Sequence, residues 1–354
     1  MKKSLLALAA LTAFAGVASA QSSVTIFGVV DLNARHQDNT GSAGSIKSLS
    51  TDGNASSRLG FRGVEDLGGG MRAGFWVEGS LVPDTGNAGG MTWQRRSTVS
   101  LMGGFGELRL GRDYTPTFWN QTVFDPFGTN GVGAQTNLMS QVAGTSASAT
   151  GSVLASGATT QVRANNSIGY FLPAMGGIYG QVMVAAGEGV TGNKYFGGRL
   201  GYAAGPVNVA VSAGKTEVTP SLDLKTGSIA GSFNLGFMTV MGQFHRSNLD
   251  GAGVDRDQTN WLAGVTVPLG AGTFKASYSK VDTDITNTQE VSANQIAVGF
   301  VYDLSKRTAL YTHVSRIDND AGARFITSGS GAALPAGVSG RVSKGYEFGV
   351  RHSF

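Results

Sequence analysis

Beyond residue 21, hydrophobic and polar side chains alternate with a period of two along most of the chain. Alternation of this kind is typical of β-strands that have one apolar and one polar face. No long stretch has the 3.6-residue spacing of an amphipathic helix. The clearest runs are 24–34, 57–65, 97–103, 106–112, 166–172, 259–267, 273–279, 294–302 and 307–317. The pattern predicts an all-β protein.

The connections between these runs are of two kinds, and the two kinds alternate along the chain. Short, Gly-rich or polar turns are expected at 65–71, 103–107, 172–177, 202–206, 233–237, 267–272 and 302–307. Longer polar loops are expected at about 37–53, 83–91, 113–162, 187–192, 216–224, 248–255, 283–289 and 318–341. These fifteen connections join sixteen strands. Short turns at one end and long loops at the other indicate a transmembrane antiparallel β-barrel, because the loops of a soluble sandwich need not sort by length.

The last nine residues, "YEFGVRHSF", continue the alternation up to the final residue, Phe354. In a closed barrel the last strand must pair with the first, since an open edge in lipid leaves backbone groups without hydrogen bonds. We therefore expect one set of side chains to face lipid, with His352 near the headgroups, and the other set to face a wet lumen. The lipid set is Tyr346, Phe348, Val350 and Phe354, and the lumen set is Glu347, Arg351 and Ser353.

The first twenty residues read as a secretory signal peptide. Lys2 and Lys3 form a basic start, residues 5–17 are apolar, and residues 18–20 ("ASA") are a small-residue cleavage site. The apolar run is shorter than the roughly 20 residues that a membrane span needs. The expected mature chain, 21–354, forms a single barrel domain.

Composition agrees with an exported barrel. The chain has no Cys, 54 Gly, 8 Pro and only 14% charged residues. Glycine scattered through apolar stretches fits many short strands and tight turns. The formal charge of +4 falls to near +2 once Lys2 and Lys3 leave with the signal peptide, and no basic run or basic helix is present. We therefore expect no nucleic-acid partner.

Catalytic chemistry finds little support. The four histidines, at positions 36, 245, 313 and 352, are scattered and form no metal-binding or triad pattern. We predict no catalytic site, no metal site and no cofactor. The tryptophans at 76, 93, 119 and 261 are expected in the interfacial girdle or on the lipid face. The alternative, a row of aromatic residues that guides sugars through the lumen, has only Phe118 and Trp119 as candidates.

Several motifs together resemble the general porins of beta-proteobacterial outer membranes, and above all their anion-selective members. They are "SRLGFRGVEDLGGGMRAGFWVEG" (57–79), "RRSTVSLMGGFGELRLGRDYTPTF" (95–118), "FDPFG" (124–128), "RANNSIGYFLP" (163–173), "YDLSKRTALYTHVSRI" (302–317) and the terminal "GVRHSF". The resemblance implies a homotrimer of sixteen-stranded barrels in the outer membrane of a Gram-negative bacterium, in contact with lipid and lipopolysaccharide. It also implies that loop 113–162, the third long loop, folds inward and narrows the pore. The outer-membrane assembly machinery would read the terminal strand that ends at Phe354.

Strand alternation sorts the charged side chains between the two faces of the barrel. Leu59 and Phe61 form an apolar pair, so their charged neighbours point into the lumen. Applied to four strands, the rule predicts the lumen-facing charges Arg58, Arg62, Glu78, Glu107, Arg109 and Arg163. The pair Arg95 and Arg96 is ambiguous. Alternation points Arg96 inward, the resemblance favours Arg95, and a strand end or bulge shifts the alternation, so both stay candidates.

By resemblance, Arg58, Arg95 and Arg163 form a basic ladder at the constriction, opposed in part by Glu78. Asp113 and Asp125 flank or lie in the inward loop and would supply an acidic side. Arg199 and Arg256 are placed outside this group. A ring of arginines in a narrow wall concentrates anions and repels cations. The alternative is that these arginines are solvated interior charges braced by carboxylates.

The predicted function is a passive, water-filled diffusion porin for small hydrophilic solutes, with a preference for small anions and no turnover. A first alternative is a substrate-specific channel for organic acids or phosphate on the same fold, which would show saturation. A second is a barrel enzyme or adhesin without a conducting lumen.

Overall fold

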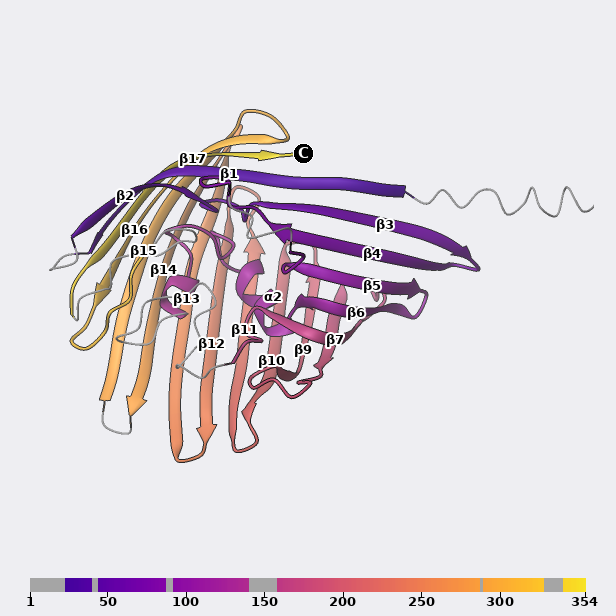
Figure 1. Ribbon diagram of the computed structural model, residues 1–354. Coiled ribbons are helices and arrows are strands. Elements are labelled where there is room, and N and C mark those ends of the chain that lie inside the picture. Colours follow the sequence, from indigo (N-terminus) through magenta and orange to yellow (C-terminus); the bar gives the residue numbers. More distant parts are fainter. Residues whose placement is uncertain (1–22, 40–43, 87–91, 140–157, 287–288, 328–339) are drawn as a thin grey trace, which may run out of the picture.

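The computed structural model describes residues 23–39, 44–86, 92–139, 158–286, 289–327 and 340–354. These residues form one antiparallel sheet of seventeen strands that closes on itself (Figure 1). Among the described residues, no helix is long and apolar enough to cross a membrane. The strands are β1 (Ser23–Asn39), β2 (Ser45–Thr51), β3 (Arg58–Gly68), β4 (Met71–Ser80), β5 (Arg96–Gly103), β6 (Gly106–Tyr114), β7 (Arg163–Phe171), β8 (Ile178–Ala185), β9 (Lys194–Ala204), β10 (Val207–Thr219), β11 (Leu222–Asn234), β12 (Thr239–Gly251), β13 (Val254–Leu269), β14 (Gly272–Thr286), β15 (Gln289–Asp303), β16 (Thr308–Asn319) and β17 (Ser343–Ser353).

The seventeen strands build a barrel of sixteen positions, because β2 and β3 share one side of β1. Strand β3 pairs with residues 23–29 of β1, and β2 pairs with residues 32–38. Every other strand pairs with its neighbours in the chain, and β17 pairs with β1 from Ser353↔Val29 to Ser343↔Asn39. The predicted closed sixteen-stranded antiparallel barrel is therefore confirmed.

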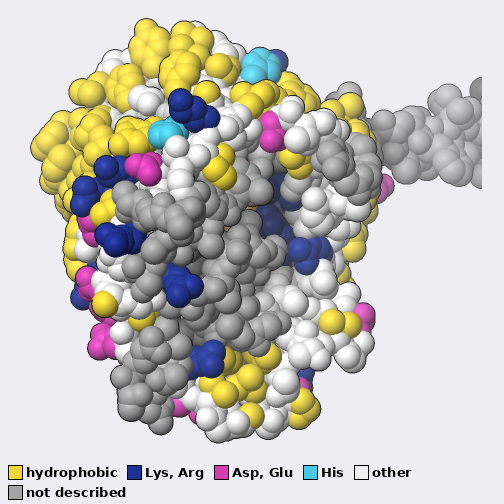
Figure 2. Space-filling view, turned by 60° about the vertical axis from the view of Figure 1, so that its left-hand side comes forward, with side chains coloured by type: hydrophobic (Ala, Val, Ile, Leu, Met, Phe, Trp, Pro, Cys, Tyr) yellow, Lys and Arg dark blue, Asp and Glu magenta, His cyan; other side chains and the backbone are white. Residues whose placement is uncertain are grey.

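The side chains follow the inverted pattern of a barrel in lipid. On β10, Val209 and Val211 are 45% and 49% exposed, whereas Ala210 and Ser212 between them are buried. The same alternation brings large apolar residues to the outside of most strands, where Figure 2 shows them gathered along the outer edge of the molecule. Polar residues accordingly line the inside.

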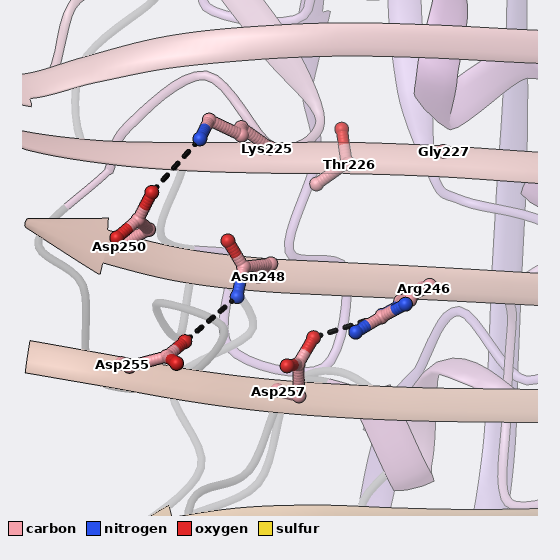
Figure 3. A pocket seen from close by; sticks show the side chains of 8 residues that line it. All are labelled: Lys225, Thr226, Gly227, Arg246, Asn248, Asp250, Asp255 and Asp257. Carbon is pink, nitrogen blue, oxygen red and sulfur yellow. Dashed lines mark hydrogen bonds and ion pairs between the residues drawn. The ribbon is translucent and has the colours of Figure 1, made fainter.

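The apolar outer face gives way to paired charges on the strands β11, β12 and β13. Lys225 pairs with Asp250 at 2.9 Å, and Arg246 pairs with Asp257 at 2.9 Å (Figure 3). Further along two of these strands, Phe244 and Trp261 are exposed on the same outer face. The change from apolar side chains to ion pairs marks the expected boundary between hydrocarbon and headgroups on the long-strand side of the barrel.

The predicted short turns are present, but several of the predicted long loops are wrong. The stretch 37–53 contains the end of β1 and all of β2, and strands β10 to β13 extend so far that 216–224 and 248–255 contain connections of only two residues. The polar side chains there do not end the strands, because backbone pairing does not depend on side-chain polarity and cross-strand pairs such as Lys215–Asp223, 2.6 Å, add support. The connection between β14 and β15 lies outside the described residues.

Loop 113–162 folds into the barrel, as predicted. It carries the helices α2 (Pro116–Val123) and α3 (Thr136–Met139), and α2 contacts strands β8 to β11 while α3 contacts β14 and β15. Phe124, Phe127 and Leu138 are almost completely buried. The barrel wall binds the loop backbone, since Gln295 Nε2 donates to Gly133 O at 2.8 Å. Residues 140–157 of the loop lie outside the described part of the chain.

The barrel closes where the last residue meets the first strand. Gly28 and Phe354 exchange two backbone hydrogen bonds of 3.1 Å. The Phe354 ring lies across the outer face of Gly28, so that a Cβ atom on residue 28 would stand 2.3 Å from the ring Cζ. Gly28 therefore leaves the space in which the terminal ring seals the seam.

Replacing Gly28 by Ala should weaken closure, because the added methyl group collides with the Phe354 ring. Overpacking of this kind costs about 1–3 kcal/mol. We expect a smaller fraction of the chain to reach the folded, heat-modifiable form on unheated gels. Gly242→Ala is the matched control, because the nearest atom to its new Cβ is 3.9 Å away. Equal folded fractions for the two variants would show that closure of the barrel does not depend on the packing of the Phe354 ring against Gly28.

Candidate functional site

Three arginines, two from the strands β3 and β7 and one from the residue just before β5, are linked through two shared partners inside the barrel. Arg58 of β3 and Arg95 both approach Glu78 Oε1, with Nε–O distances of 3.8 Å and 2.6 Å. Arg95 Nη2 and Arg163 Nη2 both donate to the Tyr114 hydroxyl, at 3.3 Å and 2.8 Å. The three predicted ladder residues thus form one continuous chain of contacts, Arg58–Glu78–Arg95–Tyr114–Arg163.

The ambiguity between Arg95 and Arg96 disappears because both side chains reach the interior. Strand β5 begins at Arg96, and the alternation of the strand points this side chain inward. Arg96 Nε donates to Thr98 Oγ1 at 3.0 Å. Arg95 precedes the strand and its backbone N–H donates to Glu78 O at 3.0 Å. Alternation does not constrain Arg95 outside the strand, so its side chain turns toward Glu78.

Tyr114 links the arginines to the inward loop. Its ring stacks on Phe118 of α2 at 5.0 Å and meets Trp119 edge-on at 5.2 Å. The Arg163 guanidinium lies over the same ring, 4.3 Å from its centroid. Sequence reasoning missed this residue, and its only signal was its place at the end of β6, two residues before the proline that opens α2.

The acidic residues beside this group are largely occupied by Arg109. Arg109 Nη1 lies 2.5 Å from Asp113 Oδ2, and its Nε lies 2.9 Å from Glu107 Oε1. Its guanidinium also packs over Phe171, 4.0 Å from the ring centroid. Arg109 is therefore a charge that two carboxylates brace within the wall, as the alternative interpretation expected of interior arginines.

Comparison with known proteins decides the family. The sequence model described as Gram-negative porin matches residues 7–322. The chain belongs to the Gram-negative porin family.

Individual relatives agree with this assignment along the whole chain. The porin is 36% identical to outer membrane porin protein 32 of Delftia acidovorans, over 100% of both chains. It is 26% identical to an outer membrane porin protein of Bordetella pertussis, over 96% of this chain and 100% of that protein. Among solved structures, the anion-selective porin from Comamonas acidovorans matches with a TM-score of 0.83 and 34% identity, over 94% of this chain and 100% of that one. The protein is an outer-membrane channel of a Gram-negative bacterium.

Asp125 lies in the inward loop, as the sequence placed it, but it does not face the pore. The porin buries this residue inside loop 113–162, where Oδ1 accepts the Phe127 N–H at 2.8 Å and Oδ2 accepts the Gln135 N–H at 2.9 Å. Burial raises the pKa of the Asp125 carboxyl group, and the two N–H donors oppose that shift. Asp125 holds the shape of the loop and does not supply an open acidic surface to the pore.

One expectation about a tryptophan is wrong, whereas the placement of Arg199 outside the constriction stays a prediction. Arg199 donates to Asn120 of α2 and, at 3.2 Å, to the Tyr179 hydroxyl. Trp76 does not face lipid, because it shares the inward alternation of Glu78 and donates from Nε1 to Glu78 Oε2 at 3.1 Å. Trp261, in contrast, is exposed on the outer face as predicted.

His313 takes part in a buried cluster of charged side chains that supports the structure of the porin. His313 Nδ1 lies 2.8 Å from Glu347 Oε1, and Arg35 Nη2 lies 3.0 Å from Glu347 Oε2, all three being almost completely buried. Glu347 Oε1 also accepts the N–H of Val132 in the inward loop at 3.3 Å. In the part of the chain that the structure describes, no group of three or more His, Asp or Glu is placed to hold a metal ion.

Tyr114→Phe should loosen the chain of arginines without removing a charge. Arg95 keeps Glu78, but Arg163 loses its hydroxyl acceptor, a contact of about 1 kcal/mol. We expect a roughly twofold rise in open-channel current noise in planar bilayers, since a guanidinium that changes position modulates the ion path. The control is Tyr202→Phe, a hydroxyl deletion at an exposed position on the outer face of β9. Noise equal in both variants would argue that Tyr114 does not hold the arginines.

Proposed function

We propose that this porin is a diffusion channel that prefers anions, and that Arg58, Arg95 and Arg163 produce the preference. Support comes from the unequal pairing of charges within the contact chain. Arg58 and Arg95 share one carboxylate, Glu78, and Arg163 contacts a neutral phenol. Among the described residues, no second carboxylate lies within ion-pair distance of these three arginines. Three positive charges therefore face one negative charge.

The size of this excess is sufficient for selectivity. A unit charge a few ångströms from a passing ion contributes about 1 kcal/mol in water, and more where the wall excludes water. Two uncompensated charges therefore favour anions over cations by roughly tenfold or more, because 1.4 kcal/mol corresponds to a factor of ten. Arginine keeps its charge in any pore environment.

The neighbouring charges do not cancel the excess. Arg109 and the more distant Arg96 face Asp113 and Glu107, so this second group is close to neutral. Figure 2 shows Lys and Arg side chains recessed in the hollow of the molecule, where solutes would pass them. The solved structure that is 34% identical is described as an anion-selective porin, which supports the same preference here.

The proposal includes the surroundings in which the channel works. We expect a homotrimer in contact with outer-membrane lipid and lipopolysaccharide, small anions as the main solutes, and recognition of the terminal strand by the assembly machinery. The position of Phe354 at the seam supports recognition by the assembly machinery. The residue that the machinery would recognise is also the one that completes the barrel. A signal peptide at residues 1–20, which lie outside the described residues, remains part of the prediction.

The central test replaces Arg58, Arg95 and Arg163 together by Ser and measures the reversal potential across a planar bilayer in a salt gradient. Wild-type porin should show anion preference, and the triple variant should shift toward cations. The shift should be large at low salt and smaller at high salt, where the screening length falls to about 3 Å at 1 M.

The matched control is Arg246→Ser, because Arg246 lies on the outer face and pairs with Asp257. It should leave the reversal potential unchanged. A triple variant that keeps its anion preference at low ionic strength would refute the arginine mechanism. Conductance that saturates with one organic acid or with phosphate would instead favour a substrate-specific channel.

A further inference from the structure

A second group of arginine and aromatic side chains lines the interior next to the constriction. Phe27 of β1, Arg62 of β3, Trp76 of β4 and Arg96 of β5 all belong to the inward-facing sets of their strands. Arg62 lies directly opposite Trp76 in the register of β3 and β4. These four residues come from adjacent positions of the barrel wall, so they form one continuous surface.

The aromatic part of this surface is tightly built. Phe27 and Trp76 meet with ring centroids 4.8 Å apart. The Phe27 ring can lie across β3 because residue 60 is glycine, where a Cβ atom would stand 2.3 Å from the ring Cζ. Trp76 is also fixed by the hydrogen bond from its Nε1 to Glu78. The two rings are therefore a rigid base that does not have to be ordered when a ligand arrives.

The Arg62 guanidinium lies over the Phe27 and Trp76 rings, and its N–H groups are not used by other side chains of the described residues. Its Cζ atom lies 5.4 Å from the Phe27 centroid and 5.2 Å from the Trp76 centroid. The side chain is exposed and, within the described ranges, makes no ion pair or hydrogen bond. Arg96 approaches the same indole at 4.5 Å. Rings hold the guanidinium through cation–π attraction, which leaves its N–H groups available to an anion.

Arg62 and its aromatic partners lie at a different depth in the pore from the constriction. Arg62 lies four residues beyond Arg58 on β3, toward the short turn between β3 and β4. At about 3.4 Å per residue, that places it roughly 14 Å along the strand from Arg58 at the constriction. Short turns mark the periplasmic end of such barrels, so an entering solute passes Arg62 after the constriction.

We propose that Arg62, held against Phe27 and Trp76 with Arg96 beside it, is a second anion-binding site of the pore, and that it favours carboxylates with an aromatic ring. A carboxylate accepts two parallel N–H bonds from a guanidinium. The ring of such a ligand gains contact with the half-buried aromatic surface next to Arg62, which acetate or chloride does not. The inference depends on the barrel being a water-filled channel and not on the arginines of the constriction.

The test measures the chloride current through single channels of the full chain while benzoate or acetate is added on both sides. With wild-type porin, benzoate should reduce the current to a saturating level, at a half-blocking concentration about fivefold below that of acetate. Arg62→Gln should raise the half-blocking benzoate concentration by about tenfold, and Arg62→Lys should have an intermediate effect because it keeps the charge and loses the planar fork. Phe27→Leu should bring benzoate to the acetate value.

Arg72→Gln is the matched control, an exposed arginine on the inward-facing set of β4 that makes no ring contact among the described residues. It should leave the block unchanged. The inference is overturned if Arg62→Gln is blocked like the wild type, or if benzoate and acetate block equally. It is also overturned if replacing Arg58, Arg95 and Arg163 abolishes the benzoate block while Arg62→Gln keeps it, since the block then belongs to the constriction. Each variant is first shown to be folded by its heat-modifiable mobility.

Discussion

The whole structure depends on one requirement, that every backbone N–H and C=O group in lipid has a hydrogen-bond partner within the protein. A sheet meets this requirement only when it has no edge. The chain meets it by pairing β17 with β1 and by ending on Phe354, whose backbone completes the ladder at Gly28. Lipid then surrounds the sheet, so the large apolar side chains lie outside and the polar ones inside.

Closure creates a polar interior that the chain itself partly fills. Loop 113–162 enters this space and buries Phe124 and Leu138 against apolar patches of the wall, Ala210 and Ala230 for Phe124 and Val281, Val291 and Ile317 for Leu138. Polar wall residues bind polar groups of the loop, as Gln295 does at Gly133 and Ser228 does at Asn120, 3.1 Å. The loop consequently has a fixed course against β8–β11 and β14–β15. The arginines that project from β3 and β7 stand on the wall that remains.

The interior arginines differ mainly in what holds them. Arg109 is held by two carboxylates and contributes little net charge, whereas Arg163 is held by the Tyr114 ring and hydroxyl and keeps its charge for solutes. Arg62 is likewise held by rings. Aromatic partners position a guanidinium without neutralising it. A pore that must attract anions therefore gains more from tyrosine and tryptophan beside its arginines than from further carboxylates.

The sequence by itself determined the barrel, its sixteen positions and the inward direction of Arg58 and Glu78, because alternation and turn chemistry are local properties that every strand repeats. The inward course of loop 113–162 followed only from the resemblance to general porins. It did not determine where the strands β10 to β13 end, since polar alternating residues continue a ladder as well as they form a loop. It also gave the wrong surroundings to Asp125, expected on an acidic side of the pore, and to Trp76, expected in the girdle or on the lipid face. Their environments depend on contacts with residues elsewhere in the chain, Gln135 for Asp125 and Arg62 for Trp76. Only closure of the barrel around its loop brings such residues together, so the charge that each one presents to the pore is decided by the tertiary structure.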